Sequence, residues 1–501
     1  MNHLNPFIEE RLMGFMAESG PARSVARVLA ISMATALLSA CAVGPDYVRP
    51  ELPEVKGYIH QGAGADVPAP QADPEFWRNL GDPLLEQLVD AALLHNHDLR
   101  IALANYQEAN ALLRGAKFDR FPTVTADIQA NNVRSSADQA PGISRSDRDH
   151  DDFQGNIGFT WELDLFGRVR RSIEAQRADT AASAEDLAAM QVAVVGQLAR
   201  TYFQLRGLQE QLRIARENAD NQSRTLGLLQ TRFEAGTATP FDVDRGRTQL
   251  ETTLSRTPSL EAQIAVATNR VAVLTGATPQ ALSSQLSLPV ALPPLPERIV
   301  ADAPSELLRR RPDVAAAERR LAAATARIGV ATADLFPRFT LGGLIGTQAF
   351  DSGALFERDS ETRLLSLGID GSFLNVGRVR ARIAAADATA AGNLATYERT
   401  VLVALEETEN ALVQLSRSGR EAKHLEQASA AGVRAAGMAR VRFEQGAIDV
   451  LELLDAENER LQAEDAYAQG RVRNTEAVVS LYQALAGGWP NHMPVDSVAT
   501  K

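Results

Sequence analysis

The amino-acid sequence predicts a mainly α-helical chain that is internally duplicated and carries four β-strands. Motifs recur at one offset: Arg232-Phe-Glu-Ala-Gly236 returns as Arg442-Phe-Glu-Gln-Gly446, and Gly167-Arg-Val-Arg170 returns as Gly377-Arg-Val-Arg380, each 210 residues later. The composition is rich in Ala, Leu, Arg, Glu and Gln, and aromatic residues make up only 5%, as in long helices and coiled coils. In two places the hydrophobic period also changes from helical to two, which is typical of strands.

The first 40 residues have the features of a secretory signal. Arg23 and Arg27 precede an apolar run that ends in Leu38-Ser-Ala-Cys41, which resembles a bacterial lipobox. We therefore predict that residues 1–40 are removed and that Cys41 becomes the acylated first residue of a lipoprotein, with palmitate among its chains. The alternative is an ordinary signal with a chance cysteine. Residues 41–81 are expected to form a Pro-rich extended segment that is too polar to build its own core.

Repeat one, residues 82–276, is expected to contain three helices. They run from Asp82 to about Asp119, from Gly167 to about Glu234, and from Phe241 to Leu274, where Pro258 kinks or interrupts the last. At about 1.5 Å per residue the long helix extends on the order of 100 Å, roughly twice the length of the return helix. We therefore expect the two shorter helices to stack end to end along the long one.

A β-hairpin is expected between the first two helices, over residues 122–165. Apolar and polar residues alternate from Thr123 to Ala130 and again from Asn156 to Leu165, on either side of a polar loop from Arg134 to Asp152. Each strand has roughly the 9–11 residues that a tilted membrane strand needs. The alternation alone favours a soluble hairpin packed on a core.

A Pro-rich linker, residues 277–304, is expected to cross between the halves without helix. Repeat two, residues 305–487, has the same order of elements with a β-hairpin over residues 338–374, and residues 488–501 form a C-terminal tail. Four strands cannot close a barrel, and an open edge in lipid leaves backbone groups unsatisfied at a cost of several kcal/mol each. If the strands lie in a membrane, the chain must therefore oligomerise.

The composition limits the function. The net charge of −12 argues against a nucleic-acid surface, because phosphate binding needs a basic face. The sequence contains no Gly-rich phosphate loop, no Cys/His metal-ligand spacing and no serine elbow. We therefore expect no catalytic residue, no metal site and no cofactor, and a function in conduction and docking.

A spaced set of motifs resembles the TolC-type outer-membrane efflux proteins, specifically the lipoprotein branch that works with RND pumps. The resemblance covers nearly all of the chain after the lipobox cysteine. Its carriers are Cys41-Ala-Val-Gly-Pro-Asp-Tyr47, Phe76-Trp77, Gly81-Asp-Pro83, Trp161-Glu-Leu-Asp-Leu-Phe-Gly-Arg168, Leu307-Leu-Arg-Arg-Arg-Pro-Asp-Val314, Ala333-Asp-Leu-Phe-Pro337 and the two Arg-Phe-Glu-x-Gly turns.

The resemblance implies a homotrimer. Its transmembrane β-strands, four per chain, would form a 12-strand β-barrel in the outer membrane, continuous with a 12-helix α-barrel of long antiparallel coiled-coil helices across the periplasm. The chain is then expected to be a channel, not an enzyme, that is lipid-anchored at Cys41 and passively conducts small toxic molecules or drugs, with antibiotic resistance as a consequence. Expected partners are a periplasmic adaptor protein, an inner-membrane RND-type pump and outer-membrane lipid. The alternatives are a conduit for metal ions or secreted polypeptides, and a structural coiled-coil lipoprotein that does not span the membrane.

The candidate site residues lie at the two Gly-containing turns. Leu451 and Asp455, four residues apart, share a helix face beside the Gly446 turn. The resemblance implies that they narrow the periplasmic entrance as a leucine ring and an aspartate ring, which gate by dewetting and charge. Arg245 lies 210 residues before Asp455, and a contact between them would tie the closed entrance together.

The resemblance also implies that the adaptor docks at the turns of Gly236 and Gly446. Gly446 is expected to end its helix, because Gly takes a left-handed φ without strain, and Asp449 is expected to cap the return helix. The alternatives are plain helix packing for Leu451, a solvated face for Asp455 and plain helix–turn–helix chemistry for both turns.

Overall fold

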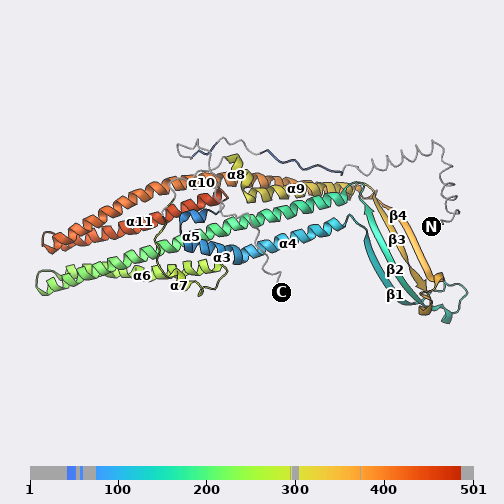
Figure 1. Ribbon diagram of the computed structural model, residues 1–501, viewed down its shortest axis with the longest axis horizontal. Helices are drawn as coiled ribbons and strands as arrows, with labels where there is room; N and C mark the ends of the chain where they lie inside the picture. Colours follow the sequence, from blue (N-terminus) through green and yellow to red (C-terminus); the bar gives the residue numbers. More distant parts are fainter. Residues whose placement is uncertain are drawn as a thin grey trace, which may run out of the picture. The chain divides into compact units, whose positions relative to one another are not determined.

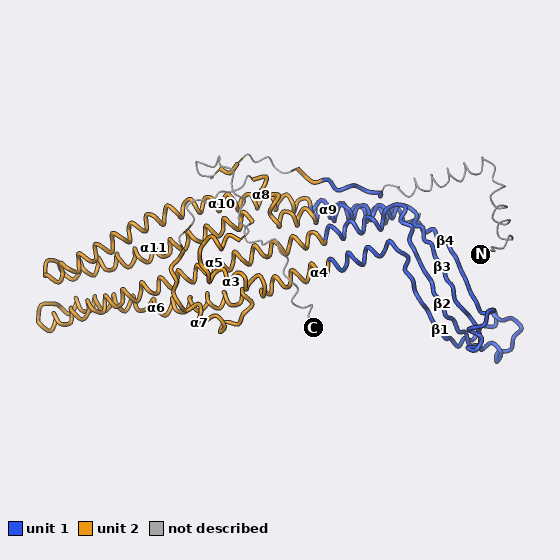
Figure 2. The backbone as a smooth tube through the Cα atoms, in the orientation of Figure 1, with its two compact units in different colours: residues 1–48, 110–179, 320–393 blue, residues 49–109, 180–319, 394–501 orange. Residues whose placement is uncertain are grey.

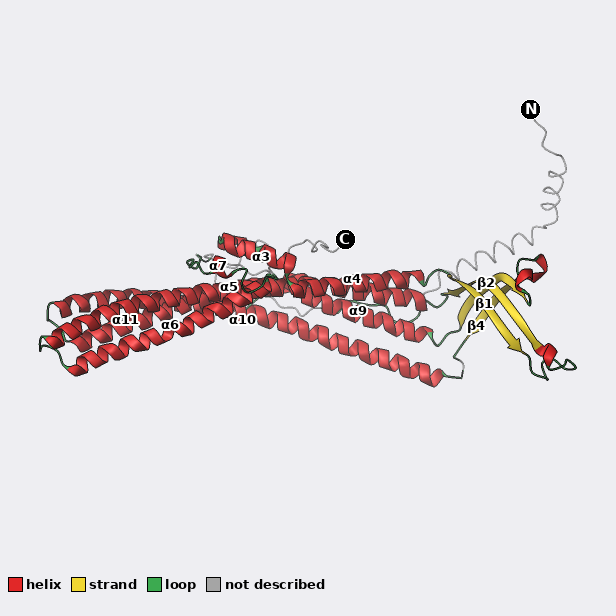
Figure 3. Cartoon of the chain, turned by 90° about the horizontal axis from the view of Figure 1, so that it is seen from below, coloured by secondary structure: helices red, strands yellow, loops and turns green. Residues whose placement is uncertain are grey.

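The computed structural model describes residues 42–51, 57–59, 75–293, 295, 304–372 and 374–486. The predicted signal segment, Cys41 and the predicted tail of residues 488–501 lie outside the described residues. Helices dominate and four strands follow one another in space (Figures 1 and 3). The elements are η1 (Phe76–Leu80), α3 (Pro83–His95), α4 (His97–Phe118), β1 (Thr123–Arg134), η2 (Ser146–Arg148), β2 (Asp149–Leu163), α5 (Arg168–Glu234), α6 (Pro240–Leu274), α7 (Ser283–Leu286), α8 (Pro304–Arg310), α9 (Pro312–Ala333), β3 (Arg338–Ala349), η3 (Ser352–Ala354), η4 (Arg358–Ser360), β4 (Glu361–Asp370), α10 (Val376–Glu444) and α11 (Val450–Ala484).

The chain forms two compact units, shown in two colours in Figure 2. Helices α4, α5, α9 and α10 contribute residues to both of them. Unit 1 comprises Met1–Val48, Asn110–Asp179 and Arg320–Asn393, and unit 2 comprises Arg49–Ala109, Thr180–Arg319 and Leu394–Lys501.

Unit 1 contains the sheet, in which four strands pair antiparallel in the order β1-β2-β3-β4. The register aligns the apolar positions, because Ile157 of β2 lies opposite both Ala126 of β1 and Ile345 of β3. Leu341 of β3 likewise lies opposite Leu367 of β4. One face of the sheet is therefore largely apolar across all four strands, although Arg363 of β4 lies opposite Ile345. It is also exposed, with its side chains at Val124, Ile128, Ile157, Ile345, Leu365, Leu367 and Ile369.

Both predicted hairpins are present, but one strand is longer than predicted. Strand β2 begins at Asp149, whereas residues up to Asp152 were expected to be loop. Cross-strand polar pairs extend the ladder: Arg134 pairs with Asp149, and Asn132 donates to Asp151 at 2.8 Å. Such pairs stabilise neighbouring strands, and hydrophobic alternation does not reveal them.

Unit 2 is built around an aromatic core. Phe76 and Trp77 of η1 are buried beside Tyr202 of α5, and the Phe76 ring stacks on Tyr482 of α11 with centroids 4.6 Å apart. Tyr202 donates a hydrogen bond of 2.5 Å to Asp82, the residue that caps α3. Burial, together with this bond, raises the pKa of Tyr202, so the phenol is a neutral donor. The last residues of the predicted extended segment thus belong to the core of the helices.

The first helix of each half is broken, and this corrects the continuous helix expected from Asp82 to Asp119. Asn96 separates α3 from α4, and Arg311 separates α8 from α9. The side chain of Asn96 donates to the carbonyl of Leu274, the last residue of α6, at 2.8 Å. Arg311 donates to the carbonyl of Ala484, the last residue of α11, at 3.2 Å. Because the final carbonyls of a helix lack partners within it, each break satisfies the end of the return helix that meets it.

Two further expectations change. Of the kink or interruption expected at Pro258, the interruption is absent, because α6 runs through this residue. The linker expected to lack helix contains the short helix α7, whose Leu286 is buried in the core of unit 2. Within the described residues, no helix is both long and apolar enough to cross a membrane.

Candidate functional site

The two turns that join the long helices to their return helices have the same backbone structure. Helix α5 ends before Gly236 with φ 73°, and α10 ends before Gly446 with φ 71°. In each turn the glycine N–H and the next N–H donate back to the last helical turn; Thr237 donates to the carbonyl of Arg232 and Ala447 to that of Arg442, both at 2.8 Å. This is the Schellman pattern of a glycine-terminated helix, so the prediction that Gly446 ends its helix is confirmed.

The residues that start the return helices differ. Asp449 caps α11 by accepting a hydrogen bond of 3.0 Å from the N–H of Glu452, as predicted. At the equivalent position Thr239 caps α6 in a capping box, in which Thr239 and Asp242 each accept from the other's backbone N–H. A capping box satisfies two orphan donors instead of one.

The predicted contact between Arg245 and Asp455 is present. Their Nη2 and Oδ1 atoms lie 3.6 Å apart, and both side chains are partly solvent-exposed. The two residues line a hollow of about 590 Å³ between α6 and α11, together with Phe241, Gln249 and Asn458 among others. Opposite charges therefore connect the return helices of the two halves.

Leu451 lies one turn before Asp455, and its side chain is 40% exposed. Phe241, 210 residues earlier, is 67% exposed. Phe241 was not predicted as a site residue, although the offset that relates Arg245 to Asp455 also relates Phe241 to Leu451. Each half thus places an exposed apolar residue at its tip.

A buried ion pair lies close to the tip. Arg440 of α10 and the buried Glu457 of α11 approach to 2.7 Å, and Thr225 of α5 also donates to Glu457 at 3.2 Å. The hydrophobic periodicity of a single helix could not predict these interactions, because the three residues come from three different helices. A buried carboxylate that is paired and hydrogen-bonded fixes the relative positions of the helices that supply its partners.

Near the sheet, the described residues that follow Cys41 are held by one buried arginine. We call residues 42–48 the N-terminal strap. Arg171 of α5 donates to the carbonyls of Val43 and Gly44 at 3.2 and 3.3 Å and forms an ion pair of 2.6 Å with Asp46. The N–H of Val43 also donates to the carbonyl of Phe166 at 3.1 Å. The strap is therefore hydrogen-bonded through its backbone.

Glycines make room for the strap. Gly44, with φ 91°, lies directly against Gly329 of α9, so a Cβ on Gly44 would overlap the Gly329 backbone. A Cβ on Gly167, whose φ is 82°, would overlap Ala42. At these positions only glycine combines the left-handed conformation with the close approach. Gly167 belongs to a motif that recurs at Gly377, and the repetition alone gave no sign of its contact with the strap.

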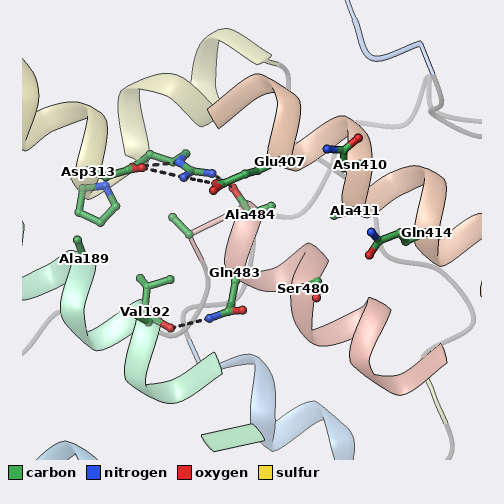
Figure 4. A pocket seen from close by; sticks show the side chains of 14 residues that line it. Ala189, Val192, Asp313, Glu407, Asn410, Ala411, Gln414, Ser480, Gln483 and Ala484 are labelled. Carbon is green, nitrogen blue, oxygen red and sulfur yellow. Dashed lines mark hydrogen bonds and ion pairs between the residues drawn. The ribbon is translucent and has the colours of Figure 1, made fainter. Parts of the chain in front are cut away.

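A pocket of about 410 Å³, lined by both polar and apolar side chains, opens beside the break between α8 and α9 (Figure 4). Arg311 is buried there and pairs with Asp313 at 2.7 Å and with Glu407 at 2.6 Å. Gln483 reaches across the pocket and donates to the carbonyl of Val192 at 3.2 Å. This network gives a structural role to the Arg-Pro-Asp part of the motif that ends at Val314. In the part of the chain that is described, no group of three or more His, Cys, Asp or Glu side chains is arranged to hold a metal ion.

Comparison with known proteins gives consistent matches over most of the chain. The family model described as "Outer membrane efflux protein" matches residues 88–277 and 303–487. The chain is 30% identical over 464 residues to the solvent efflux pump outer membrane protein SrpC of Pseudomonas putida, which covers 90% of this chain and 96% of SrpC. It is 32% identical over 453 residues to the outer membrane protein OprJ of Pseudomonas aeruginosa, covering 90% and 94%. Among solved structures, the outer-membrane channel OprN is similar with a TM-score of 0.83 at 38% identity, covering 90% of this chain and all of that one.

Proposed function

Because the chain belongs to the outer membrane efflux protein family, we propose that three copies form a channel that passively conducts small toxic molecules from the periplasm to the exterior. Its place as an outer-membrane component of an efflux system follows from the family. The proposed cargo class is supported by relatives named for the efflux of solvents and toluene and for the export of pyoverdine.

The observation that carries the proposal is the four-stranded sheet of unit 1. One face of it is largely apolar across all four strands and is exposed, as a face against lipid requires. Strands β1 and β4 each have one unpaired edge, and an unpaired edge in hydrocarbon is too costly to persist. Edges of neighbouring copies satisfy each other in a closed 12-strand β-barrel, which makes the homotrimer the unit of function.

Anchoring by acylated Cys41 is the second part of the proposal. Support comes from the strap, because a peptide bond joins Cys41 to Ala42, and Ala42 packs against Gly167 at the end of β2. A lipid attached one residue before this point would lie beside the sheet, where the hydrocarbon is. Mass spectrometry of the N-terminal peptide should find an acylated Cys41, and an unmodified terminus elsewhere in the purified protein would contradict the anchor.

The entrance is proposed to lie at the helix tips, with Leu451 as an apolar constriction and Asp455 as a charged ring that Arg245 offsets. Exposed Leu451 and the Arg245–Asp455 contact support this assignment. The turns at Gly236 and Gly446 are the proposed docking sites for a periplasmic adaptor, which would connect the channel to an inner-membrane RND-type pump. Their equal backbone structure offers equivalent sites in both halves.

The test removes the constriction. In the double variant Leu451→Ala and Asp455→Ala, both the apolar plug and the charged ring are lost, so single-channel conductance in planar bilayers should rise several-fold. Cells that carry the variant should also become more permeable to bulky antibiotics. A double variant that inserts normally and conducts like the wild type would place the constriction elsewhere. A stable monomer in detergent with protected strands would contradict the homotrimer itself.

A further inference from the structure

The contact between Arg232 and Phe443 joins the two halves at the helix tips. Because both halves contain the same Arg-Phe pair, an equivalent second contact is expected. The guanidinium of Arg232, on α5, lies over the ring of Phe443, on α10, with 4.1 Å between its central carbon and the ring centroid. The same arginine donates to the carbonyl of Phe443 at 3.0 Å. Phe443 is only 3% exposed and belongs to an apolar cluster with Leu229, Val243 and Leu453. The contact therefore combines a cation–π interaction, a hydrogen bond and burial.

The equivalent pair is not formed within the chain. A shift of 210 residues converts Arg232 into Arg442 and Phe443 into Phe233. Phe233 is 45% exposed, and the exposed side chain of Arg442 makes no hydrogen bond or ion pair with any residue that the structure describes. The same two residue types therefore lie in different environments. Arg232 and Phe443 contact each other, whereas the side chains of Arg442 and Phe233 are exposed to solvent.

This pattern is that of a head-to-tail interface. Repeat one supplies the arginine and repeat two the phenylalanine, so each chain retains an unused arginine on repeat two and an unused phenylalanine on repeat one. Complementary unused surfaces on opposite sides of a protomer generate a closed ring when the rotation between copies closes. The second half of the contact is then available only from another copy of the chain.

We propose that the tip contact is repeated between copies, with Arg442 of one protomer over Phe233 of the next. This inference rests on the proposed homotrimer and specifies one of its interfaces. The proposed contact also explains why both turns contain an Arg-Phe pair. In repeat one the arginine of the pair is used within the chain, and in repeat two it is used between chains.

The shift of 210 residues, combined with the step to the next protomer, also applies to the charged residues at the entrance. Arg245 and Asp455 occupy equivalent positions, so the shift converts their 3.6 Å contact into a contact between Asp455 and Arg245 of the next protomer. The charges around the entrance then alternate in sign. Three aspartates alone would repel one another, whereas an alternating ring gives every carboxylate a guanidinium on each side.

Cysteine cross-linking tests the Arg442–Phe233 contact directly, because Cys41 is the only cysteine of the chain. In a Cys41→Ser background, Arg442→Cys with Phe233→Cys is treated with a short bismaleimide. Denaturing gels should then show covalent dimers and trimers in high yield. The matched control, Arg232→Cys with Phe443→Cys, should link within one chain and stay at the monomer mass, and each single-cysteine variant should not link.

The outcomes separate this inference from the proposed function. Light scattering in detergent reports the trimer independently of the cysteines. A trimer in which Arg442→Cys with Phe233→Cys gives only monomer overturns the inter-protomer contact and leaves the channel proposal standing. A monomer by light scattering overturns both. If the cysteine pair disturbs folding, Phe233→Leu and Arg442→Lys provide the second measurement: each should lower the heat resistance of the trimer, and unchanged resistance in both would also overturn the contact.

The alternating ring has its own test. Arg245→Asp places carboxylates at every position of the ring, so conductance should rise several-fold. Arg245→Asp with Asp455→Arg exchanges the two charges and restores alternation, so conductance should return to within about twofold of the wild type. Equal conductance of all three proteins would exclude the ring.

Discussion

Equivalent return helices and first helices of the two halves have the same lengths, but the residues near the N-terminal strap differ between the halves. Helices α6 and α11 each have 35 residues, and α4 and α9 each have 22. At the strap, in contrast, Arg171 corresponds to Ala381 at the offset of 210 residues. Before the hairpins the offset is 215, as between Phe121-Pro122 and Phe336-Pro337, so Gly329 corresponds to Arg114. Length is retained because stacked helices must match each other along the whole layer. Side chains diverge where one half meets something that the other half does not meet, such as the single N-terminus.

The largest expected difference between the halves concerns Arg171. Arg171→Leu removes the donors that hold the strap, whereas Ala381→Leu changes the equivalent position of repeat two, which has no strap. Hydrogen bonds to charged groups contribute about 1.5–3 kcal/mol each. Exchange of the Val43 amide should therefore accelerate by about a hundredfold or more in Arg171→Leu and stay unchanged in Ala381→Leu. Hydrogen-exchange mass spectrometry measures both, and equal protection in the two variants would mean that Arg171 does not hold the strap.

The next contrast uses the repeated glycine. Gly167→Ala forces a side chain into a left-handed residue, at about 1–3 kcal/mol, and against Ala42. Gly377 has no neighbour within contact distance of a Cβ and no positive φ, so Gly377→Ala should stay within about 0.5 kcal/mol. The midpoint of heat-induced unfolding, followed by circular dichroism, should fall clearly only for Gly167→Ala. A similar fall for both would show that the motif has the same role in each half.

The caps of the return helices provide a smaller contrast. Thr239→Ala and Asp449→Ala should each cost about 1 kcal/mol, as is usual for loss of a cap. Asp242→Ala should also have a cost, because Asp242 completes the capping box, whereas Glu452→Ala should have almost none. Amide exchange in the first turn of α6 and of α11 measures these effects. A cost for Glu452→Ala equal to that of Asp242→Ala would show that the two caps work in the same way.

The smallest expected effect is that of salt on the entrance. An exposed ion pair such as Arg245–Asp455 contributes about 0–1 kcal/mol, and the screening length falls from about 10 Å at 0.1 M salt to about 3 Å at 1 M. The fraction of time that the channel stays closed should therefore decrease modestly as salt increases. Asp455→Asn should lose most of this dependence, and a variant that retains it would assign the salt effect to other charges.

Prediction from sequence succeeded where a pattern repeats along one element. The 210-residue offset, the alternation in the strands and the Gly446 and Asp449 signals are all local, and the turns and hairpins follow from them. The break at Asn96 was not predicted, although the sequence contains a signal for it. Pro312 marks the equivalent break in repeat two, and the offset of 215 residues between Asp98 and Asp313 relates Pro312 to His97.

The remaining features depend on residues that are distant in sequence. The Arg440–Glu457–Thr225 group joins three helices, and Arg171 reaches a segment about 128 positions away. No periodicity within a helix specifies which side chain of another helix lies opposite. The contact between Arg245 and Asp455 was predictable only because the duplication itself relates the two positions.

The strap also constrains the order in which the chain folds. Its residues are synthesised before every helix and strand that the structure describes, yet the surface that receives them includes Arg171 of α5 and Gly329 of α9, the latter 285 positions after Gly44. Contacts of such large sequence separation form late, because the loop between them must close first. The strap therefore cannot reach its final position until α9 has been made and packed, and a strap in its bound position marks a chain in which both halves have already come together.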